Sequence, residues 1–549
     1  MLGDMAEITG AEALLLENLG TPFLSYVLNS DAHLVAARLS EGALLGDPRE
    51  AILQELLRFL GLIAVAPDQN PFATSQSLGA LGQFDARAGL GWSTARRAEL
   101  GADVDIPPTD DPVAHELLPI ARDLYPLFLL PQLPGLPVTY GLTTPPISQP
   151  LYQHPQRLAF EDAANRDPVL HRLFTEDDGT PERLLRLYRS TGIAGGLPSE
   201  LFADGVLRVS WEAATRKRAM PFFQEFAEAV IAELRAIRTV LTEPETAIRA
   251  YIGLAGLRIP VGRSLDVPWG VIREISLEDE SMIPPGLRGT LQTNTPDGTI
   301  TIDYAGDCVL EMDVPYRVLL AAPHGPPDPW PLELVSTHAV EERLQIVRIA
   351  LLLSSEREQI PIIVGTWRSF LDPLAIGARG SSWSDPRRLP TLSPIALTDG
   401  EVDAWGSWIA LIDSASIEGI EIALRRTLLA AAERADPVDA LVDTIIAWEN
   451  LFGSRSGEPT LRISSSMAWL LGDDGLSRRE IRREVGRLYS LRSDVVHGNR
   501  PLAPEEAVQG RSSALRLTVD ALKRLISDRP ELLDCRNGDE RSNRLILDV

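Results

Sequence analysis

The 549-residue sequence has very few cysteines and lysines and no long apolar run. Its two cysteines, Cys308 and Cys535, are too few for a disulfide framework or a cysteine-rich zinc site. The longest apolar runs, such as the one near residue 349, fall far short of the roughly 18 residues that span a membrane. The first residues lack the basic and apolar segments of a secretory signal. We therefore expect a cytoplasmic protein that makes no membrane contact.

The common catalytic signatures are also missing. The sequence has no glycine-rich phosphate loop, no H-E-x-x-H zinc motif and no nucleophile elbow. Its seven histidines include no i, i+4 pair that could bind a metal. The acidic, proline-containing stretch 103–112 is more typical of a solvated loop than of a metal site. We expect neither a metal nor an organic cofactor.

The charge is strongly negative overall but unevenly distributed. A formal net charge of −25 argues against a protein that coats nucleic acid, because phosphate binding depends on clustered Lys and Arg. Between residues 477 and 500, however, seven arginines face three acidic residues. Since Lys217 and Lys523 are the only lysines, codon bias is one explanation for the preference for arginine. A basic stretch on an acidic protein also fits one localised phosphate site.

The chain is too long to fold around a single hydrophobic core, so the sequence predicts a multidomain protein. Residues 1–245 are expected to be mostly helical, with a proline-rich irregular connector at 105–150. Short alternating runs and an Asp-Gly turn predict a β-rich, mixed α+β region at 246–395, which we interpret as a sensor or regulatory region. Within it we expect a helix at 335–355 and a linker or surface loop at 377–394.

Residues 396–549 predict an all-α helical bundle, which makes the chain mainly α with a β-rich middle. Asp436-Pro437 and Ala503-Pro504 are helix starts, and Gly472 and Gly498 are helix stops. The expected helices are 399–413, 416–434, 437–452, 463–471, 477–497 and 504–527.

Arg492 and His497 lie at the end of the most basic of these helices. Five positions on a helix separate two side chains by about 140°, so the two do not share a face. If Gly498 ends the helix, the imidazole of His497 lies on its last turn. A guanidinium matches a phosphate and an imidazole transfers protons, so the pair suits metal-free cleavage of a phosphodiester. The alternative is a capping histidine beside a surface arginine, because Arg-His pairs at similar spacing also occur by chance.

Three stretches of this region resemble the HEPN superfamily, specifically its Apea-like branch. They are a helix with Glu449 before Leu451 and Phe452, an R-I-S helix start at 462–464, and L-Y-S-L-R-S-D-V-V-H-G at 488–498. The resemblance covers roughly the last 150 residues and is most specific at its R-S-D-V-V-H-G end. It says nothing about residues 1–395.

The resemblance implies a ribonuclease, often part of a toxin or anti-phage system, in which two subunits pair and their R-x4–6-H motifs line one cleft. It assigns catalysis to Arg492 and His497: His497 moves the proton of the RNA 2′-OH, and Arg492 stabilises the phosphate. The need for a 2′-OH restricts the substrate to RNA. The residues expected to support catalysis are Ser493, Asp494, Tyr489 and Asn499, although Tyr489 also fits a core position. The residues expected to bind the RNA backbone are Arg478, Arg482, Arg483 and Arg487, although they also fit a solvated helix face.

The leading hypothesis is a regulated HEPN endoribonuclease that cleaves RNA as a homodimer joined through the C-terminal bundle. The N-terminal region would then respond to a trigger ligand or protein. One alternative is a non-catalytic HEPN-like module that binds RNA or dimerises. Another places any activity in residues 1–395.

Overall fold

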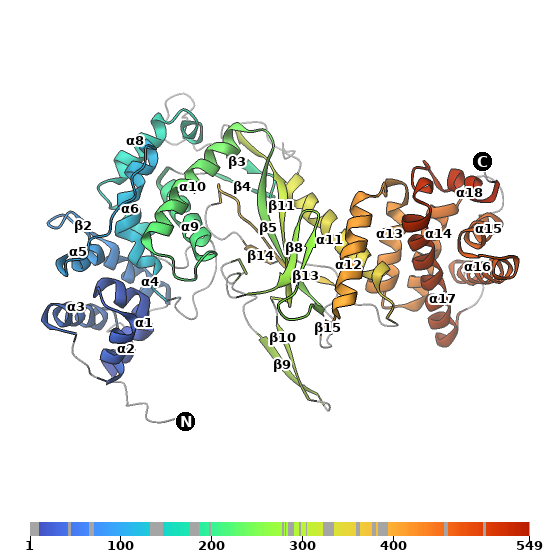
Figure 1. Cartoon of the computed structure of the whole chain (residues 1–549), viewed down its shortest axis with the longest axis horizontal. Coiled ribbons are helices and arrows are strands. Elements are labelled where there is room, and N and C mark those ends of the chain that lie inside the picture. The colour runs from blue at the N-terminus through green and yellow to red at the C-terminus, as the bar shows by residue number, and fades with distance from the viewer. Residues whose placement is uncertain are drawn as a thin grey trace.

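The computed structural model describes most of the chain in three successive parts. The described residues are 10–41, 45–64, 71–131, 146–174, 186–196, 199–276, 279, 282–283, 290–295, 298–303, 305–321, 334–357, 363–375, 380–382, 394–454, 459–497 and 501–547. Figure 1 shows an elongated molecule with a helical N-terminal part, a twisted sheet in the middle and a helical bundle at the C-terminal end. The coarse prediction, mainly α with a β-rich middle, is confirmed.

The N-terminal part is built from short, apolar-faced helices. The helices up to residue 128 are α1 (Gly10–Val27), α2 (Ala32–Glu41), α3 (Asp47–Ala64), α4 (Pro71–Leu78), α5 (Trp92–Glu99) and α6 (Pro112–Phe128). They are joined by the two-residue strands β1 (Phe84–Asp85) and β2 (Leu90–Gly91). The helical prediction for this stretch is correct.

The prediction of an irregular proline-rich connector at 105–150 is wrong for α6, which is a 17-residue helix and almost entirely buried. Asp111 caps its start by accepting hydrogen bonds from the backbone N–H groups of Val113 and Ala114. Pro112 takes the first helical position, where no amide is needed. Pro126 leaves the carbonyl of Arg122 without its usual amide donor. The Thr94 hydroxyl donates to that carbonyl instead, at 3.4 Å.

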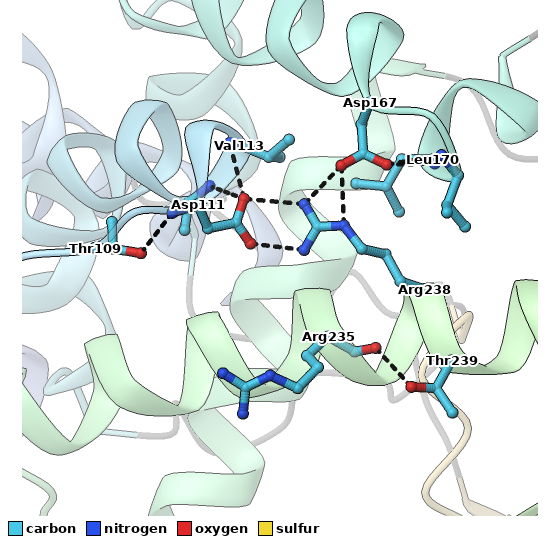
Figure 2. Close-up of polar contacts among 10 residues, drawn as sticks. Thr109, Asp111, Val113, Asp167, Leu170, Arg235, Arg238 and Thr239 are labelled. Carbon is cyan, nitrogen blue, oxygen red and sulfur yellow. Dashed lines mark hydrogen bonds and ion pairs between the residues drawn. The ribbon is translucent and has the colours of Figure 1, made fainter.

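The sequence suggested that Asp111 lies in a solvated acidic loop, but the structure shows its carboxylate bound to an arginine. Its two oxygens accept bonds of 2.9 and 2.6 Å from the guanidinium of Arg238. The same guanidinium donates from Nε to Asp167 at 2.9 Å, as Figure 2 shows. Arg238 thus joins three helical segments of the N-terminal part.

The rest of the N-terminal part contains four further helices and one unexpected hairpin. The helices are α7 (Ser148–Tyr152), α8 (Arg157–Arg166), α9 (Ser199–Thr215) and α10 (Phe223–Thr242). The strands β3 (Arg186–Arg189) and β4 (Ile193–Gly196) pair antiparallel inside a stretch predicted to be helical. Buried Arg189 lies in β3 and reaches Asp372 at 3.3 Å, a long-range pairing that no local pattern reveals.

The central sheet has six strands in the order β14-β13-β5-β11-β8-β7, all pairings antiparallel. Its strands are β5 (Thr246–Ala255), β7 (Ser264–Val267), β8 (Gly270–Glu274), β11 (Cys308–Tyr316), β13 (Val364–Phe370) and β14 (Gly380–Ser382). β14 lies in the predicted linker at 377–394, so that prediction is wrong for its three residues. Smaller pairings use β6 (Leu257–Arg258) with β15 (Ile395–Ala396), and β12 (Val318–Ala321) with β3.

The predicted Asp-Gly hairpin is confirmed as β9 (Thr290–Thr295) and β10 (Gly298–Asp303). The strands pair antiparallel from Thr295 opposite Gly298 to Thr290 opposite Asp303. In Figure 1 this hairpin extends away from the central sheet.

One long helix, α11 (Val335–Ser354), connects the sheet with the C-terminal bundle, and its prediction at 335–355 is correct. Its carbonyl at Val347 accepts a 2.9 Å hydrogen bond from the indole of buried Trp405. Trp405 belongs to α12 (Asp399–Ser414), the first helix of the bundle. In Figure 1, α11 and α12 lie between the sheet and the remaining bundle helices.

The C-terminal bundle follows the predicted helix order closely. Its helices after α12 are α13 (Glu421–Leu428), α14 (Pro437–Phe452), α15 (Pro459–Leu471), α16 (Gly475–Val496), α17 (Pro504–Lys523) and α18 (Gly538–Leu547). α13 and α17 each continue into a five-residue π-helix.

The helix α18 was not predicted, because its buried face is largely polar and gives no apolar periodicity. Its Arg541 is fully buried and donates to the backbone carbonyls of Leu451 and Leu532 at 2.8 and 2.9 Å. The guanidinium therefore fixes the end of α14 against the C-terminal segment.

Among the described residues, no helix is long and apolar enough to cross a membrane. The described residues also include no group of three or more His, Cys, Asp or Glu side chains placed to bind a metal.

Candidate functional site

The candidate site lies on α16, whose start is fixed by its own sequence. Asp474 accepts hydrogen bonds of 2.8 Å from the backbone N–H groups of both Leu476 and Ser477. The preceding helix ends at the predicted glycine stop. A Cβ on Gly472 would lie 2.6 Å from the side chain of Arg478 and 2.9 Å from a backbone carbonyl, so no larger residue fits this corner.

The packed face of α16 is set by Val485, Leu488 and Leu491, which recur every three residues and are buried. α16 packs against α15 and α17. Where α17 crosses Leu491 it carries Gly510, and a Cβ there would lie 3.0 Å from the leucine side chain. The core therefore holds the polar flank of α16 in a fixed orientation.

His497 is the C-cap of α16, and its backbone N–H donates to the carbonyl of Ser493 at 3.0 Å. The predicted helix end at this residue is therefore confirmed to within one residue. The imidazole is exposed and is not buried in packing. Gly498 and Asn499 lie outside the described residues.

Arg492 lies on the inner flank of the helix, beside α14. Its Nη2 is 3.9 Å from Oε1 of Glu449, close enough for an ion pair but too far for a hydrogen bond. The side chains of Arg492 and Glu449 are 21% and 34% exposed, so solvent still reaches both. This contact joins the E-x-L-F and R-S-D-V-V-H-G stretches of the resemblance.

Tyr489 completes this group of three, which we call the Glu449 cluster (Glu449, Tyr489 and Arg492). Its hydroxyl donates to the same Oε1 of Glu449 at 2.8 Å. Burial, the hydrogen bond to Glu449 and the charge of that carboxylate raise the pKa of Tyr489 to about 12. The phenol therefore stays protonated at neutral pH and acts as a donor. The core-packing alternative for Tyr489 also holds in part, because its ring contacts the hydrophobic core.

The guanidinium of Arg492 keeps unused hydrogen-bonding capacity. Its Nε is buried and has no hydrogen-bond partner among the described residues. An arginine offers five N–H donors, and Glu449 is too far away to accept a hydrogen bond from the guanidinium. The terminal N–H groups of Arg492 are therefore the ones that an anion could engage.

The structure does not bring Arg492 and His497 together within one chain. Arg492 faces α14, whereas His497 is exposed at the helix end, in agreement with the 140° expected from their spacing. The supporting residues Ser493 and Asp494 lie between them on α16 and are each partly buried. A site that uses both the arginine and the histidine therefore needs a second set of side chains from elsewhere.

The four arginines predicted to bind RNA fall into two groups. Arg478 is engaged within the fold, because its Nε donates to the carbonyl of Gly472 at 3.0 Å and its guanidinium lies 3.9 Å from the ring centroid of Trp469. Arg487 pairs with Glu484 at 2.7 Å. Arg482 and Arg483 are exposed, with no ion pair among the described residues, and remain available to a phosphate backbone.

The third stretch of the resemblance has a different role. Arg462 donates to Asn543 at 2.6 Å and also pairs with Asp539, both near or on α18. The R-I-S helix start therefore attaches α18 to α15 and contributes no group to the Glu449 cluster.

Sequence reasoning missed the position of Glu449 within the site. It noted this glutamate only as part of a motif, 43 residues before Arg492, and the pairing of α14 with α16 is what makes the contact. A glutamate that breaks the apolar run before Leu451 and Phe452 was the available signal.

Comparisons of the chain with protein families, with curated proteins and with solved structures found no match.

Proposed function

We propose that the chain is a metal-independent endoribonuclease of the HEPN type, acting as a regulated toxin or anti-phage effector in the cytoplasm. The observation that carries the proposal is that α16 carries, on different sides, an exposed imidazole and a guanidinium whose Nε has no hydrogen-bond partner among the described residues. The contact between Glu449 and the Tyr489–Arg492 stretch supports it, because two separate segments of the resemblance meet there.

The chemistry assigns one role to each group. His497 removes the proton from the RNA 2′-OH, the 2′ oxygen attacks phosphorus, and the bond from phosphorus to the 5′ oxygen breaks. The leaving 5′ oxygen takes up a proton, which a second His497 supplies. Arg492 stabilises the extra negative charge on the phosphoryl oxygens in the transition state. The products are a 2′,3′-cyclic phosphate and a 5′-hydroxyl, and DNA is not cut.

A homodimer supplies the second set of side chains that one chain lacks. In a two-fold arrangement, Arg492 of one copy and His497 of the other can line a single groove even though they diverge within a chain. The exposed apolar side chain beside His497, that of Val496 at 50% exposed, is one that such an interface would cover.

The direct test is RNA cleavage in EDTA with the full chain. Wild type is expected to produce new 5′-hydroxyl ends, and His497→Ala and Arg492→Ala are each expected to abolish them. His33→Ala is the matched control, because His33 is also exposed but lies on α2 in the N-terminal part. Intact RNA with the wild-type dimer, or cleavage that survives His497→Ala, would contradict the proposal. RNA binding that survives His497→Ala without any cleavage by wild type would favour the non-catalytic alternative.

A further inference from the structure

A pocket of about 630 Å³ lies at one end of the central sheet, beside α11. This volume is within the range that small-molecule sites occupy. Its walls come from the start of β5, the turn between β7 and β8, the end of β11, and α11. The lining residues are Glu245, Thr246, Ala247, Pro268, Trp269, Gly270, Asp313, Val314, Pro315 and Arg343.

Both carboxylates of the lining form ion pairs with arginines outside it. Glu245 pairs with Arg317 at 3.3 Å, and Asp313 pairs with Nε of Arg249 at 3.0 Å. Both carboxylates are largely exposed, so each arginine offsets only part of the charge of its partner.

Arg343 differs from the other charged residues of the lining, because it forms no ion pair among the described residues. Its Nη1 donates to the backbone carbonyl of Asp313, and its guanidinium lies 5.5 Å from the ring centroid of Trp269. Burial lowers the pKa of Arg343, although acidic neighbours oppose this effect. A partly desolvated guanidinium with unused donors is stabilised by a bound anion.

We propose that this pocket binds a small organic anion, with a phosphate or carboxylate group on Arg343 and a flat apolar body against Trp269 and Pro315. The charged end is specified by Arg343, the guanidinium of the lining, which has no carboxylate within ion-pair distance among the described residues although Asp413, Glu342 and Asp313 act on it from further away. The apolar end is specified by the proline and tryptophan side chains of the lining. This inference does not rest on the proposed nuclease activity.

The occupant would touch the elements that connect the sheet to the C-terminal bundle. Arg343 belongs to α11, and the indole N–H of Trp269 donates to Asp413 on α12 at 3.0 Å. Both helices also pack against other parts of the C-terminal bundle (Figure 1). A ligand that orders Arg343 and Trp269 therefore stabilises the junction between the two parts of the molecule.

The test is isothermal titration calorimetry on the full-length chain with three probes. 5′-AMP represents an organic phosphate, benzoate an organic carboxylate, and adenosine the same ring without an anion. At least one of the two anions is expected to bind at one site per chain, and adenosine at least tenfold more weakly than 5′-AMP if the phosphate is the group recognised. Arg343→Gln is expected to weaken the anion by about tenfold or more, because a charge-assisted hydrogen bond is lost. Arg343→Lys, which keeps the charge but not the fork, is expected to lie between the two.

Arg87→Gln is the matched control, since it removes one exposed guanidinium from the N-terminal part, away from the pocket. Circular dichroism melting of each variant separates a lost site from a lost fold, and Trp269→Phe provides a second variant that keeps an aromatic wall. The proposal is overturned if neither anion binds at millimolar concentration. It is equally overturned if a folded Arg343→Gln binds as well as wild type.

Discussion

The hydroxyl of Tyr489 donates to Oε1 of Glu449 across 2.8 Å, and this bond ties α16 to α14 beside the candidate catalytic arginine. The same oxygen lies 3.9 Å from Arg492. The same oxygen of Glu449 therefore accepts a hydrogen bond from Tyr489 and attracts the guanidinium of Arg492. Because the ion pair is too long for a hydrogen bond, Glu449 can direct Arg492 without occupying its donors.

We expect Tyr489→Phe to slow RNA cleavage through the position of Arg492, if the proposed nuclease activity is correct. The loss of one hydrogen bond costs about 1 kcal/mol, which corresponds to roughly fivefold in kcat. Glu449→Gln is the matched variant, because its amide oxygen still accepts from Tyr489 while its charge is gone. If Glu449 orients Arg492 by charge, Glu449→Gln should lower kcat and change KM by a smaller factor. Single-turnover kinetics measures the split, and unchanged kcat in both variants would show that the cluster only packs.

The two groups of arginines on α16 are expected to behave differently in RNA binding. Arg482→Gln combined with Arg483→Gln should weaken binding at every RNA sequence. It should also reduce the slope of log K against log salt by about 0.7 for each lost single-strand phosphate contact. Arg478→Gln should leave that slope unchanged and lower thermal stability instead, since Arg478 bonds to Gly472 and stacks on Trp469. Fluorescence anisotropy with labelled RNA on the His497→Ala background measures the slope without cleavage. An equal slope change in all variants would mean that Arg478 also contacts RNA.

Helix positions were most predictable where apolar spacing and capping residues agree. α14 begins and ends where Asp436-Pro437 and the apolar period place it, and α16 ends within one residue of the expected position. α6 was missed because proline propensity argues against a helix. Complete burial of its apolar side chains outweighs that penalty, and Thr94 replaces one missing amide donor. β3 pairs with the neighbouring β4 as well as with the distant β12, and β14 pairs with β13, the strand before it. Both strands were missed because three or four residues are too few to show a clear alternating pattern.

The candidate site was predictable only as a set of residues on one helix. The spacing of Arg492 and His497 on α16 predicted that their side chains point in different directions, and they do so in the structure. The role of Glu449 could not be deduced from spacing, because it depends on how α14 packs against α16. Arg478 is held within the fold and Arg482 is exposed, and this difference likewise depends on Trp469, a residue of the neighbouring helix that contacts Arg478.

Both cysteine thiols are expected to be unreactive in the folded protein. Cys308 and Cys535 are free and buried, and burial raises the pKa of Cys308 to about 12 and also raises that of Cys535. Since the thiolate is the reactive form, neither thiol should react with a disulfide reagent at pH 8 until the chain unfolds. Counting reactive thiols should give none in the native protein and two in denaturant. Rapid labelling of the native chain would contradict the burial of at least one of them.

Arg238 is expected to contribute more stability than any exposed arginine on the same helix. It faces Asp111 and Asp167 at 2.6 to 2.9 Å, so Arg238→Gln leaves two partly buried carboxylates unpaired, at a cost of about 2 to 3 kcal/mol. The matched control is Arg235→Gln on the same helix, expected to change stability by less than about 0.5 kcal/mol, because Arg235 is exposed and makes no ion pair among the described residues (Figure 2). Hydrogen exchange of the peptides that cover α6 and α10 measures the difference.

The same three residues predict how stability in this part of the molecule depends on pH. Burial on its own would raise the pKa of each carboxyl, but hydrogen bonds from Arg238 and from backbone N–H groups outweigh it and lower both below the ordinary 3.8. The folded state therefore binds protons more weakly than the unfolded state, so the contribution is fully present above the ordinary pKa and is lost as the pH falls through the folded values. Wild type should lose protection of α6 and α10 as the pH falls below the ordinary carboxyl pKa of 3.8, whereas Arg238→Gln should show a smaller loss there, because only the backbone N–H groups then lower the two pKa values. A variant that keeps the full acid-dependent loss would show that Arg238 does not lower these two pKa values.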